Sequence, residues 1–312
     1  MKILVTGAAG FIGFHFINSI KNKKIKIYGI DNLNDYYSTK LKKDRLKYLK
    51  KNKNFYFYKI DISNFSSLKK IFKNKFDIVY NFAAQAGVRY SFQNPKQYLE
   101  SNVVGFFNIL ELSRITGIKR IFYASSSSVY GDSSSFPINE KSNLNPKNFY
   151  ALSKKNNEEI AEIYAKKYNI NLIGLRFFTV FGEWGRPDMF MMKYLESSKK
   201  NKIFRLNNFG NHIRDFTYIK DAISIIKKLK FSSRHEIYNI CSNRPVTLKY
   251  SIKLMNNFIK KPRTIKVGFQ EGDAIKTHGD NRKILRKIKG YKFTSFDSAV
   301  KKTIFWYLNY KK

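Results

Sequence analysis

The N-terminal segment carries the pattern that most restricts how this chain can fold. An apolar run, Lys2–Thr6, leads directly into glycines at positions 7, 10 and 13. Apolar residues at successive positions suit a strand buried on both faces. Glycines directly after such a strand allow a tight turn that brings the backbone close to a pyrophosphate, and the helix that follows offers its first N–H groups. We therefore predict a dinucleotide-binding loop formed by Gly7, Gly10, Phe11, Ile12 and Gly13.

An acidic residue follows at the distance that such a loop requires. The second apolar run, Ile25–Ile30, ends at Asp31, which is 18 residues past Gly13. A carboxylate about 20 residues after the loop accepts the hydroxyls of the adenosine ribose. Because a carboxylate there repels a 2′-phosphate, the predicted cofactor is NAD rather than NADP. Asn32 belongs to the same predicted site, although an Asp-Asn pair can also simply cap a loop or a helix.

Six apolar runs alternate with helical patterns over the first 176 residues. Their spacing leaves room for crossover helices, so the sequence predicts βαβ units and a parallel sheet. The third run is followed by Asp61 and Ile62. The Asp61 side chain and the Ile62 backbone N–H could hold the edge of an adenine ring. The six predicted strands are Lys2–Thr6, Ile25–Ile30, Phe55–Ile60, Asp77–Asn81, Lys119–Ala124 and Ile170–Arg176.

The regular alternation ends after Arg176, where glycines and prolines break the chain into short pieces. We expect an α/β protein with two domains: a Rossmann-type doubly wound parallel sheet and a smaller, loop-rich α/β domain that binds substrate. Tyr218–Leu229 is typical of a helix and Glu236–Ile240 of a strand. The expected boundaries are 1–175 for the NAD-binding domain, with 212–240 returning to it, and 176–211 with 241–312 for the second domain.

The charge of the chain is unusually high. Sixty Lys and Arg residues against 22 Asp and Glu give a formal net charge of +38. Such a charge normally suggests nucleic acid, but only 13 of the sixty cations are Arg and the lysines are scattered along the chain. We therefore expect a solvated surface and no specific nucleic-acid partner. A non-catalytic dinucleotide- or nucleic-acid-binding protein is the alternative from a different class.

Cysteine content and hydropathy exclude other classes. The one cysteine, Cys241, cannot form an internal disulfide, and the Cys/His spacing of a metal site is absent, so no metal is expected. No apolar run approaches the roughly 18 residues that span a membrane. We expect a cytoplasmic protein in a reducing compartment, without membrane attachment.

A hydroxyl cluster and a Tyr/Lys pair form the predicted catalytic set. Ser125–Ser128 follow the fifth predicted strand. Tyr150 and Lys154 lie at positions i and i+4 of a predicted helix, so they share one face. A lysine cation near a phenol favours the phenolate, which could then act as a base. The Tyr/Lys spacing alone is weak in a chain with 21 tyrosines. The catalytic interpretation is supported because the dinucleotide loop, the serine cluster and the Tyr/Lys pair follow one another along the chain in that order.

With these motifs in place, the chain resembles the extended short-chain dehydrogenase/reductase superfamily in its nucleotide-sugar epimerase branch, over nearly its whole length. Within that branch it is most similar to UDP-glucuronate 4-epimerases. The matching segments are the glycine loop, Asp31–Tyr37, Ala83–Arg89, Ser101–Gly105, the serine cluster, Tyr150 with Lys154, and Arg176–Gly182 continuing into Trp184–Met189.

The resemblance implies a redox-neutral cycle with NAD held through each turnover. Tyr150 would take the proton of the sugar 4-hydroxyl while C4 gives its hydride to NAD, and the keto sugar would turn over before the hydride returns. Ser126 would hydrogen-bond the sugar O4, and Lys154 would bind the nicotinamide ribose. Further cofactor contacts are implied at Ala83, Ala84 and Asn102.

The residues beside Ser126 distinguish this chain from neighbours in the superfamily. Related 4,6-dehydratases carry an Asp-Glu pair there and decarboxylases a Glu, whereas this chain has Ser127 and Ser128. With Thr179, these hydroxyls would hold the C6 carboxylate of a uronate, and Arg186 is a further candidate, although it could instead only anchor a loop. A UDP-glucose or UDP-N-acetylglucosamine 4-epimerase is the alternative on the same scaffold.

The second domain is expected to bind UDP. Arg214 fits the pyrophosphate contact of the family and Asp273 a uridine-ribose contact, while Gln270 stands where relatives often have Arg. The implied substrate set is completed by Arg89. Related epimerases form homodimers through the helices that correspond to Gln97–Ile115 and Tyr150–Tyr168, so a homodimer is expected by resemblance.

Overall fold

The computed structural model describes residues 1–270 and 272–310. The chain divides into two compact units, which are described one at a time. Unit 1 comprises 1–131, 142–177 and 229–238, and unit 2 comprises 132–141, 178–228 and 239–312. Among the described residues, no helix combines the length and the apolar character needed to cross a membrane.

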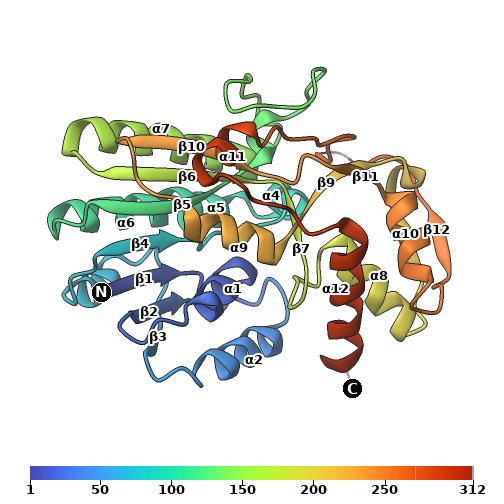
Figure 1. Ribbon diagram of the computed structural model, residues 1–312, viewed down its shortest axis with the longest axis horizontal. Helices are drawn as coiled ribbons and strands as arrows, with labels where there is room; N and C mark the ends of the chain where they lie inside the picture. Colours follow the sequence, from blue (N-terminus) through green and yellow to red (C-terminus); the bar gives the residue numbers. More distant parts are fainter. Residues whose placement is uncertain (271, 311–312) are drawn as a thin grey trace. The chain divides into compact units, whose positions relative to one another are not determined.

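Unit 1 is built on a seven-stranded sheet (Figure 1) in the order β10-β6-β5-β4-β1-β2-β3. The pairs that join β1 to β6 are all parallel, and this strand order is that of a doubly wound dinucleotide-binding sheet. The predicted Rossmann-type fold is therefore confirmed. The strands are β1 (Lys2–Thr6), β2 (Lys26–Asp31), β3 (Phe55–Lys59), β4 (Ile78–Asn81), β5 (Arg120–Ser126), β6 (Asn171–Phe177) and β10 (His235–Ile240).

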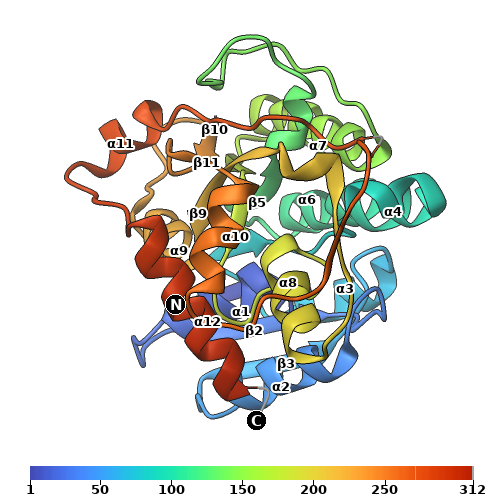
Figure 2. The same cartoon turned by 90° about the vertical axis from the view of Figure 1, so that its right-hand side faces the viewer.

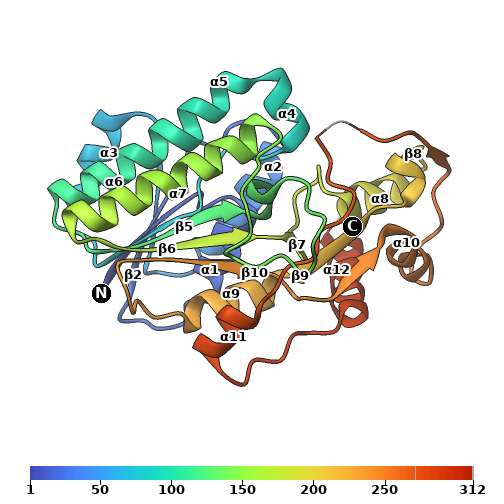
Figure 3. The ribbon, with the colours of Figure 1, turned by 90° about the horizontal axis from the view of Figure 1, so that it is seen from above.

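Helices cover the sheet of unit 1, and α3, α6 and α7 lie along one face of it (Figure 3). The core beneath them is apolar and fully buried, with Phe106, Ile109 and Leu110 of α6 packed among Val79 and Ile121 of the sheet. The helices are α1 (Phe11–Ser19), α2 (Thr39–Leu49), α3 (Phe65–Phe72), α4 (Val88–Gln93), α5 (Pro95–Tyr98), α6 (Gly105–Ile115) and α7 (Phe149–Tyr168).

The prediction of one continuous helix over Gln97–Ile115 is wrong in one respect. A π-helix, η1 (Leu99–Val104), separates α5 from α6. The wider π turn carries the buried side chain of Asn102, which bonds the backbone of Gln85 and the hydroxyl of Ser153. Apolar spacing does not reveal such an insertion, because the residues on either side keep their helical period.

Unit 2 contains two small sheets. The larger has the order β11-β9-β7, with β9 antiparallel to β11 and parallel to β7. Two further strands, β8 and β12, pair in parallel, and α10 packs beside α12 (Figure 2). The elements are β7 (Thr179–Phe181), α8 (Phe190–Lys199), β8 (Phe204–Leu206), β9 (Ile213–Tyr218), α9 (Ile219–Lys228), β11 (Pro245–Thr247), α10 (Leu248–Asn256), β12 (Thr264–Lys266), α11 (Arg282–Ile288) and α12 (Phe296–Tyr310).

The division of the chain differs from the expected boundaries in two segments. Of 212–240, only 229–238 group with unit 1, because β9 pairs with β7 and β11 and α9 packs on β9 and β7. Residues 132–141 group with unit 2, since Ile138 exchanges backbone hydrogen bonds with His278 and Asp280. Both assignments depend on pairings between distant segments, which composition and periodicity do not report.

Candidate active site

The glycine loop after β1 has a backbone that only glycine allows at two positions. Gly7 has a φ of +66°, and a Cβ there would lie 2.8 Å from the Ala83 nitrogen. A Cβ on Gly13 would lie 2.2 Å from the Gly7 carbonyl oxygen. The first turn of α1, with Phe11 and Ile12, leaves N–H groups without intrahelical acceptors at the positive end of the helix. This cradle of backbone donors fits a pyrophosphate.

Two carboxylates lie at the ends of the neighbouring strands β2 and β3. Asp31 accepts hydrogen bonds from the N–H groups of Ala9 (3.0 Å) and Leu33 (2.8 Å), and burial raises its pKa. Asn32 donates to Asp61 at 2.8 Å. Burial acts to raise the pKa of Asp61, but hydrogen bonds from Asn32 and Ser63 outweigh it and lower that pKa. The carboxyl edge of such a sheet is where dinucleotides bind.

The segment after β4 is tied to the glycine loop. The Ala83 N–H donates to the hydroxyl of Thr6 at 3.0 Å, which places Ala83 and Ala84 beside the turn at Gly7. Asn102 donates to Ser153 at 2.9 Å and accepts from the Gln85 N–H at 2.8 Å, so in this structure its amide fixes protein segments to one another. The remaining predicted residue of this stretch, Arg89, is exposed on α4.

The predicted Tyr/Lys pair lies on the first two turns of α7. Asn148 caps this helix by accepting from the Ala151 N–H at 2.9 Å, which sets the start of the helix and so the direction of Tyr150. The Lys154 ammonium lies 6.0 Å from the centre of the Tyr150 ring and donates to the Ala124 carbonyl at 2.8 Å. Burial lowers the pKa of Lys154 to about 8. The half-buried phenol therefore has a buried amine one turn away.

The serine cluster ends β5 and begins a short 3-10 helix, η2 (Ser127–Tyr130). The buried Ser126 hydroxyl donates to the Ser128 oxygen and accepts from the Ser128 N–H, both at 3.1 Å. Ser127 and Ser128 are half-buried. The arrangement supplies hydroxyl donors and acceptors in the same unit as the Tyr150 phenol, which suits proton transfer to and from a sugar oxygen.

A buried charged pair near these residues was not predicted from the sequence. Glu158 of α7 and Arg176 of β6 form an ion pair at 2.7 Å. The available signal was that Glu158 follows Lys154 by one helical turn and so continues the face that carries Tyr150. Arg176 sits at the end of a run that is otherwise apolar, where an unpaired cation would be costly.

Unit 2 holds the predicted nucleotide-binding residues. Arg214 donates to the carbonyls of Ile213 and Ile275, both at 3.0 Å. Burial lowers the pKa of Arg214 to about 10, and the nearby charge of Asp273 opposes this shift. The structure thus brings Arg214 and Asp273 together. The Gln270 side chain contacts only carbonyls of its own loop in the hydrogen bonds seen for it, at 3.4 and 3.5 Å.

Two other predicted residues also belong to unit 2. Arg186 holds Asp188 with two hydrogen bonds of 3.0 and 2.6 Å. Burial acts to raise the pKa of Asp188, but the Arg186 guanidinium outweighs it and keeps that pKa low. Thr179 is half-buried at the start of β7. Among residues 1–270 and 272–310, no cluster of His, Cys, Asp and Glu is placed to hold a metal ion.

These features together define a dinucleotide-dependent enzyme of the short-chain dehydrogenase/reductase class. They are the doubly wound sheet, its glycine loop, the acid after β2, and the Ser/Tyr/Lys set on β5 and α7. The chain belongs to the NAD dependent epimerase/dehydratase family, whose model matches residues 3–241. NAD is its cofactor, as the acidic residue after β2 predicted.

The chain is similar to several relatives in sequence and in structure. Protein CapI of Staphylococcus aureus is 40% identical over the whole of both chains. The UDP-glucuronate 4-epimerase of Thermodesulfobacterium geofontis is 36% identical, over 97% of this chain and 95% of the relative. The crystal structure of UDP-glucuronic acid 4-epimerase from Bacillus cereus in complex with UDP-glucuronic acid and NAD is 28% identical. It superposes with a TM-score of 0.91 over 99% of this chain and 100% of its own.

Proposed function

We propose that the protein is a UDP-glucuronate 4-epimerase, which interconverts UDP-glucuronate and UDP-galacturonate. The observation that carries the proposal is the Tyr150/Lys154 pair on α7 combined with hydroxyls, not acids, at Ser127 and Ser128. A site without a carboxylate at those positions has no side chain there for the proton transfers of water loss. The epimerases that share its fold and length support the same substrate.

We propose for the predicted site residues of unit 1 the roles that the resemblance implies. NAD, when bound, would supply the hydride acceptor and donor for C4 of the sugar. Tyr150 takes the proton of the 4-hydroxyl and gives it back, and Ser126 hydrogen-bonds the same oxygen. Lys154 donates to the nicotinamide ribose and favours the Tyr150 phenolate by its charge. The glycine loop holds the pyrophosphate, and Asp31, Asn32, Asp61 and Ile62 hold the adenosine.

The uronate carboxylate is assigned to hydroxyl donors. We propose that Ser127 and Ser128 of unit 1 bind it. Thr179 and Arg186, which Asp188 holds by two hydrogen bonds, stay predicted carboxylate-binding residues of unit 2. Hydrogen bonds from hydroxyls would hold the carboxylate out of alignment with the C4 keto group, which suppresses loss of CO₂ from the keto intermediate. Incubation of the purified protein with UDP-glucuronate, and in parallel with UDP-glucose, tests the assignment. We expect UDP-galacturonate as the product; NAD-loaded protein that leaves UDP-glucuronate unchanged would contradict it.

The UDP portion is assigned to unit 2, with Arg214 on the pyrophosphate and Asp273 on the ribose. Arg214 is a half-buried cation that donates to two backbone carbonyls and has the charge of Asp273 nearby. A guanidinium is suited to binding an anionic pyrophosphate. We expect Arg214→Leu to raise the KM for the UDP-sugar by about 10- to 100-fold, because a hydrogen bond to a charged group contributes about 1.5–3 kcal/mol. Steady-state kinetics checks this, with the exposed Arg205→Leu of β8 as the matched control.

A homodimer is proposed from an apolar surface of unit 1. Exposed apolar side chains gather on η1, α6 and α7, the helices that related epimerases use for dimers; they are Leu99, Val104, Phe107, Ile115, Phe149, Leu152, Ile163 and Tyr168. Apolar patches of this kind mark protein interfaces. Ile163, the most exposed of them at 63%, is expected to give a monomer when changed to Asp. Light scattering after size exclusion measures the mass, and Ile265→Asp in unit 2 is the control.

We also propose a compartment and a pathway for the enzyme. We place the enzyme in the cytoplasm and its product in polysaccharide biosynthesis. The one cysteine of the chain, Cys241, is buried and free, which suits a reducing compartment.

A further inference from the structure

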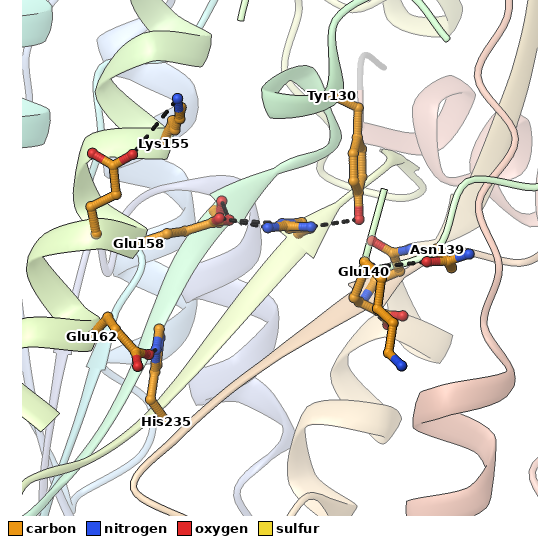
Figure 4. Close-up of polar contacts among 12 residues, drawn as sticks. Tyr130, Asn139, Glu140, Lys155, Glu158, Glu162 and His235 are labelled. Carbon is orange, nitrogen blue, oxygen red and sulfur yellow. Dashed lines mark hydrogen bonds and ion pairs between the residues drawn. The ribbon is translucent and has the colours of Figure 1, made fainter. Parts of the chain in front are cut away.

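The Glu158–Arg176 pair is the most deeply buried ion pair seen in the described residues, and its side chains are each only 4% exposed. The contact is bidentate: the guanidinium donates to the two carboxylate oxygens at 2.9 and 2.7 Å. Figure 4 shows Glu158 reaching from α7 toward the guanidinium, with Tyr130 on its far side. Two charges removed from water cost free energy unless further hydrogen bonds satisfy them.

Those further hydrogen bonds reach the segments that carry the catalytic set. Ser125 donates to Glu158 at 2.5 Å, and Ser125 directly precedes Ser126. Arg176 donates to the Tyr130 hydroxyl at 2.8 Å, and Tyr130 ends η2, which begins with Ser127 and Ser128. Glu158 itself follows Lys154 by one turn of α7. One ion pair therefore bonds the end of β5, the helix η2 and the helix α7.

Stability alone is a weak explanation for such a pair. Replacing a buried ion pair with apolar residues of similar volume often leaves a protein as stable or more so, whereas removing one partner is destabilising. What apolar residues cannot supply is direction: a planar guanidinium and a carboxylate fix the groups they bond in position and angle. The Glu158 charge also opposes the effect of burial on the Lys154 ammonium.

We propose that Glu158 and Arg176 are positioning residues of the epimerase site, which hold the Ser126 hydroxyl and the Lys154 ammonium in register with Tyr150. The inference rests on the proposed function. In this role neither residue contacts substrate or cofactor; both act through the residues they bond.

The first test compares Glu158→Gln with Glu159→Gln. Glu159 is the adjacent residue on α7, exposed and paired only loosely with Lys155 at 3.7 Å. We expect Glu158→Gln to lower kcat by about 10- to 100-fold, because misplacement of catalytic groups by about 1 Å costs up to that factor. The KM for the UDP-sugar and the NAD content should stay close to wild type, and Glu159→Gln should match wild type throughout.

The pH profile separates positioning from a purely structural role. The charged and titratable groups around Glu158 are Arg176 from β6, Tyr130 from η2, Tyr123 from β5 and Lys154 from α7. Because Glu158 acts to raise the pKa of Lys154, its loss lowers that pKa further below the normal range. We expect the alkaline limb of kcat to move to lower pH in Glu158→Gln and to stay in place in Glu159→Gln.

A double variant, Glu158→Leu/Arg176→Met, removes both charges and keeps the volume. We expect it to recover the thermal stability lost in either single variant while kcat stays low. The inference is overturned if kcat returns together with the melting temperature, or if Glu158→Gln keeps the wild-type kcat and pH profile. If wild type acts on another UDP-sugar instead of UDP-glucuronate, the substrate proposal fails, and the same comparison with that sugar still decides the roles of Glu158 and Arg176.

Discussion

Tyr150→Phe is expected to lower kcat for C4 epimerisation by about 10²- to 10⁴-fold, the range that a positioned general base contributes. The variant removes one oxygen from a half-buried ring and leaves the cap of α7 at Asn148 and the Lys154 contact with Ala124 unchanged. The loss should therefore fall on proton transfer alone. Phenylalanine cannot take the proton of the sugar 4-hydroxyl, so C4 cannot give up its hydride at a useful rate.

The measurement is the initial rate of UDP-galacturonate formation, together with the NAD content and the melting temperature of the variant. Both of the latter should match wild type. Tyr48→Phe on α2, which removes the same oxygen from an exposed ring, is the control and should keep full activity. A Tyr150→Phe enzyme with more than a tenth of the wild-type kcat would show that another group serves as the base.

Gly13→Ala is expected to weaken the binding of NAD. The added methyl would lie 2.2 Å from the Gly7 carbonyl oxygen and 2.9 Å from its carbon, and these are backbone atoms that cannot rotate away. The turn after β1 must then open, which displaces the N–H groups that hold the pyrophosphate. Backbone strain of about 1–3 kcal/mol corresponds to a rise in the Kd for NAD of about 10- to 100-fold.

Absorbance of the cofactor released on denaturation measures the NAD content, and titration of the cofactor-free protein gives the Kd. Gly268→Ala is the matched control, because a Cβ at Gly268 meets no atom of the described residues within 4 Å. The variant should retain NAD as wild type does. Normal NAD affinity in Gly13→Ala would mean that the cofactor does not depend on the geometry of this loop.

Strand prediction succeeded where the strands are buried on both faces. The predicted and observed limits of the first strand, Lys2–Thr6, are the same, and its apolar residues Ile3–Val5 are buried on both faces of the sheet. The helix at Tyr150–Tyr168 was also predicted to within one residue of α7. The π-helix at Leu99–Val104 escaped prediction, since one extra residue per turn leaves the apolar period of the flanking helices intact.

Two of the predicted binding residues also bond within the protein, and their binding roles stay predictions. Arg186 was expected to bind a substrate carboxylate, or else only to anchor a loop, and the structure shows it paired with Asp188. A pair two residues apart depends on how the loop bends, which spacing does not specify. Asn102 was expected to contact NAD and is bonded to Gln85 and Ser153.

By itself, the sequence determined the order of strands and helices over the first 176 residues, the glycine loop and the Ser126, Tyr150 and Lys154 set, because these depend on residue type and on short-range spacing. Only the tertiary structure decided that Glu158, Ser125, Arg176 and Tyr130 meet. They come from β5, η2, α7 and β6, and Glu158 and Arg176 are 33 and 46 residues away from the partners they bond in the β5–η2 segment. The burial that makes their charges consequential exists only once those elements pack.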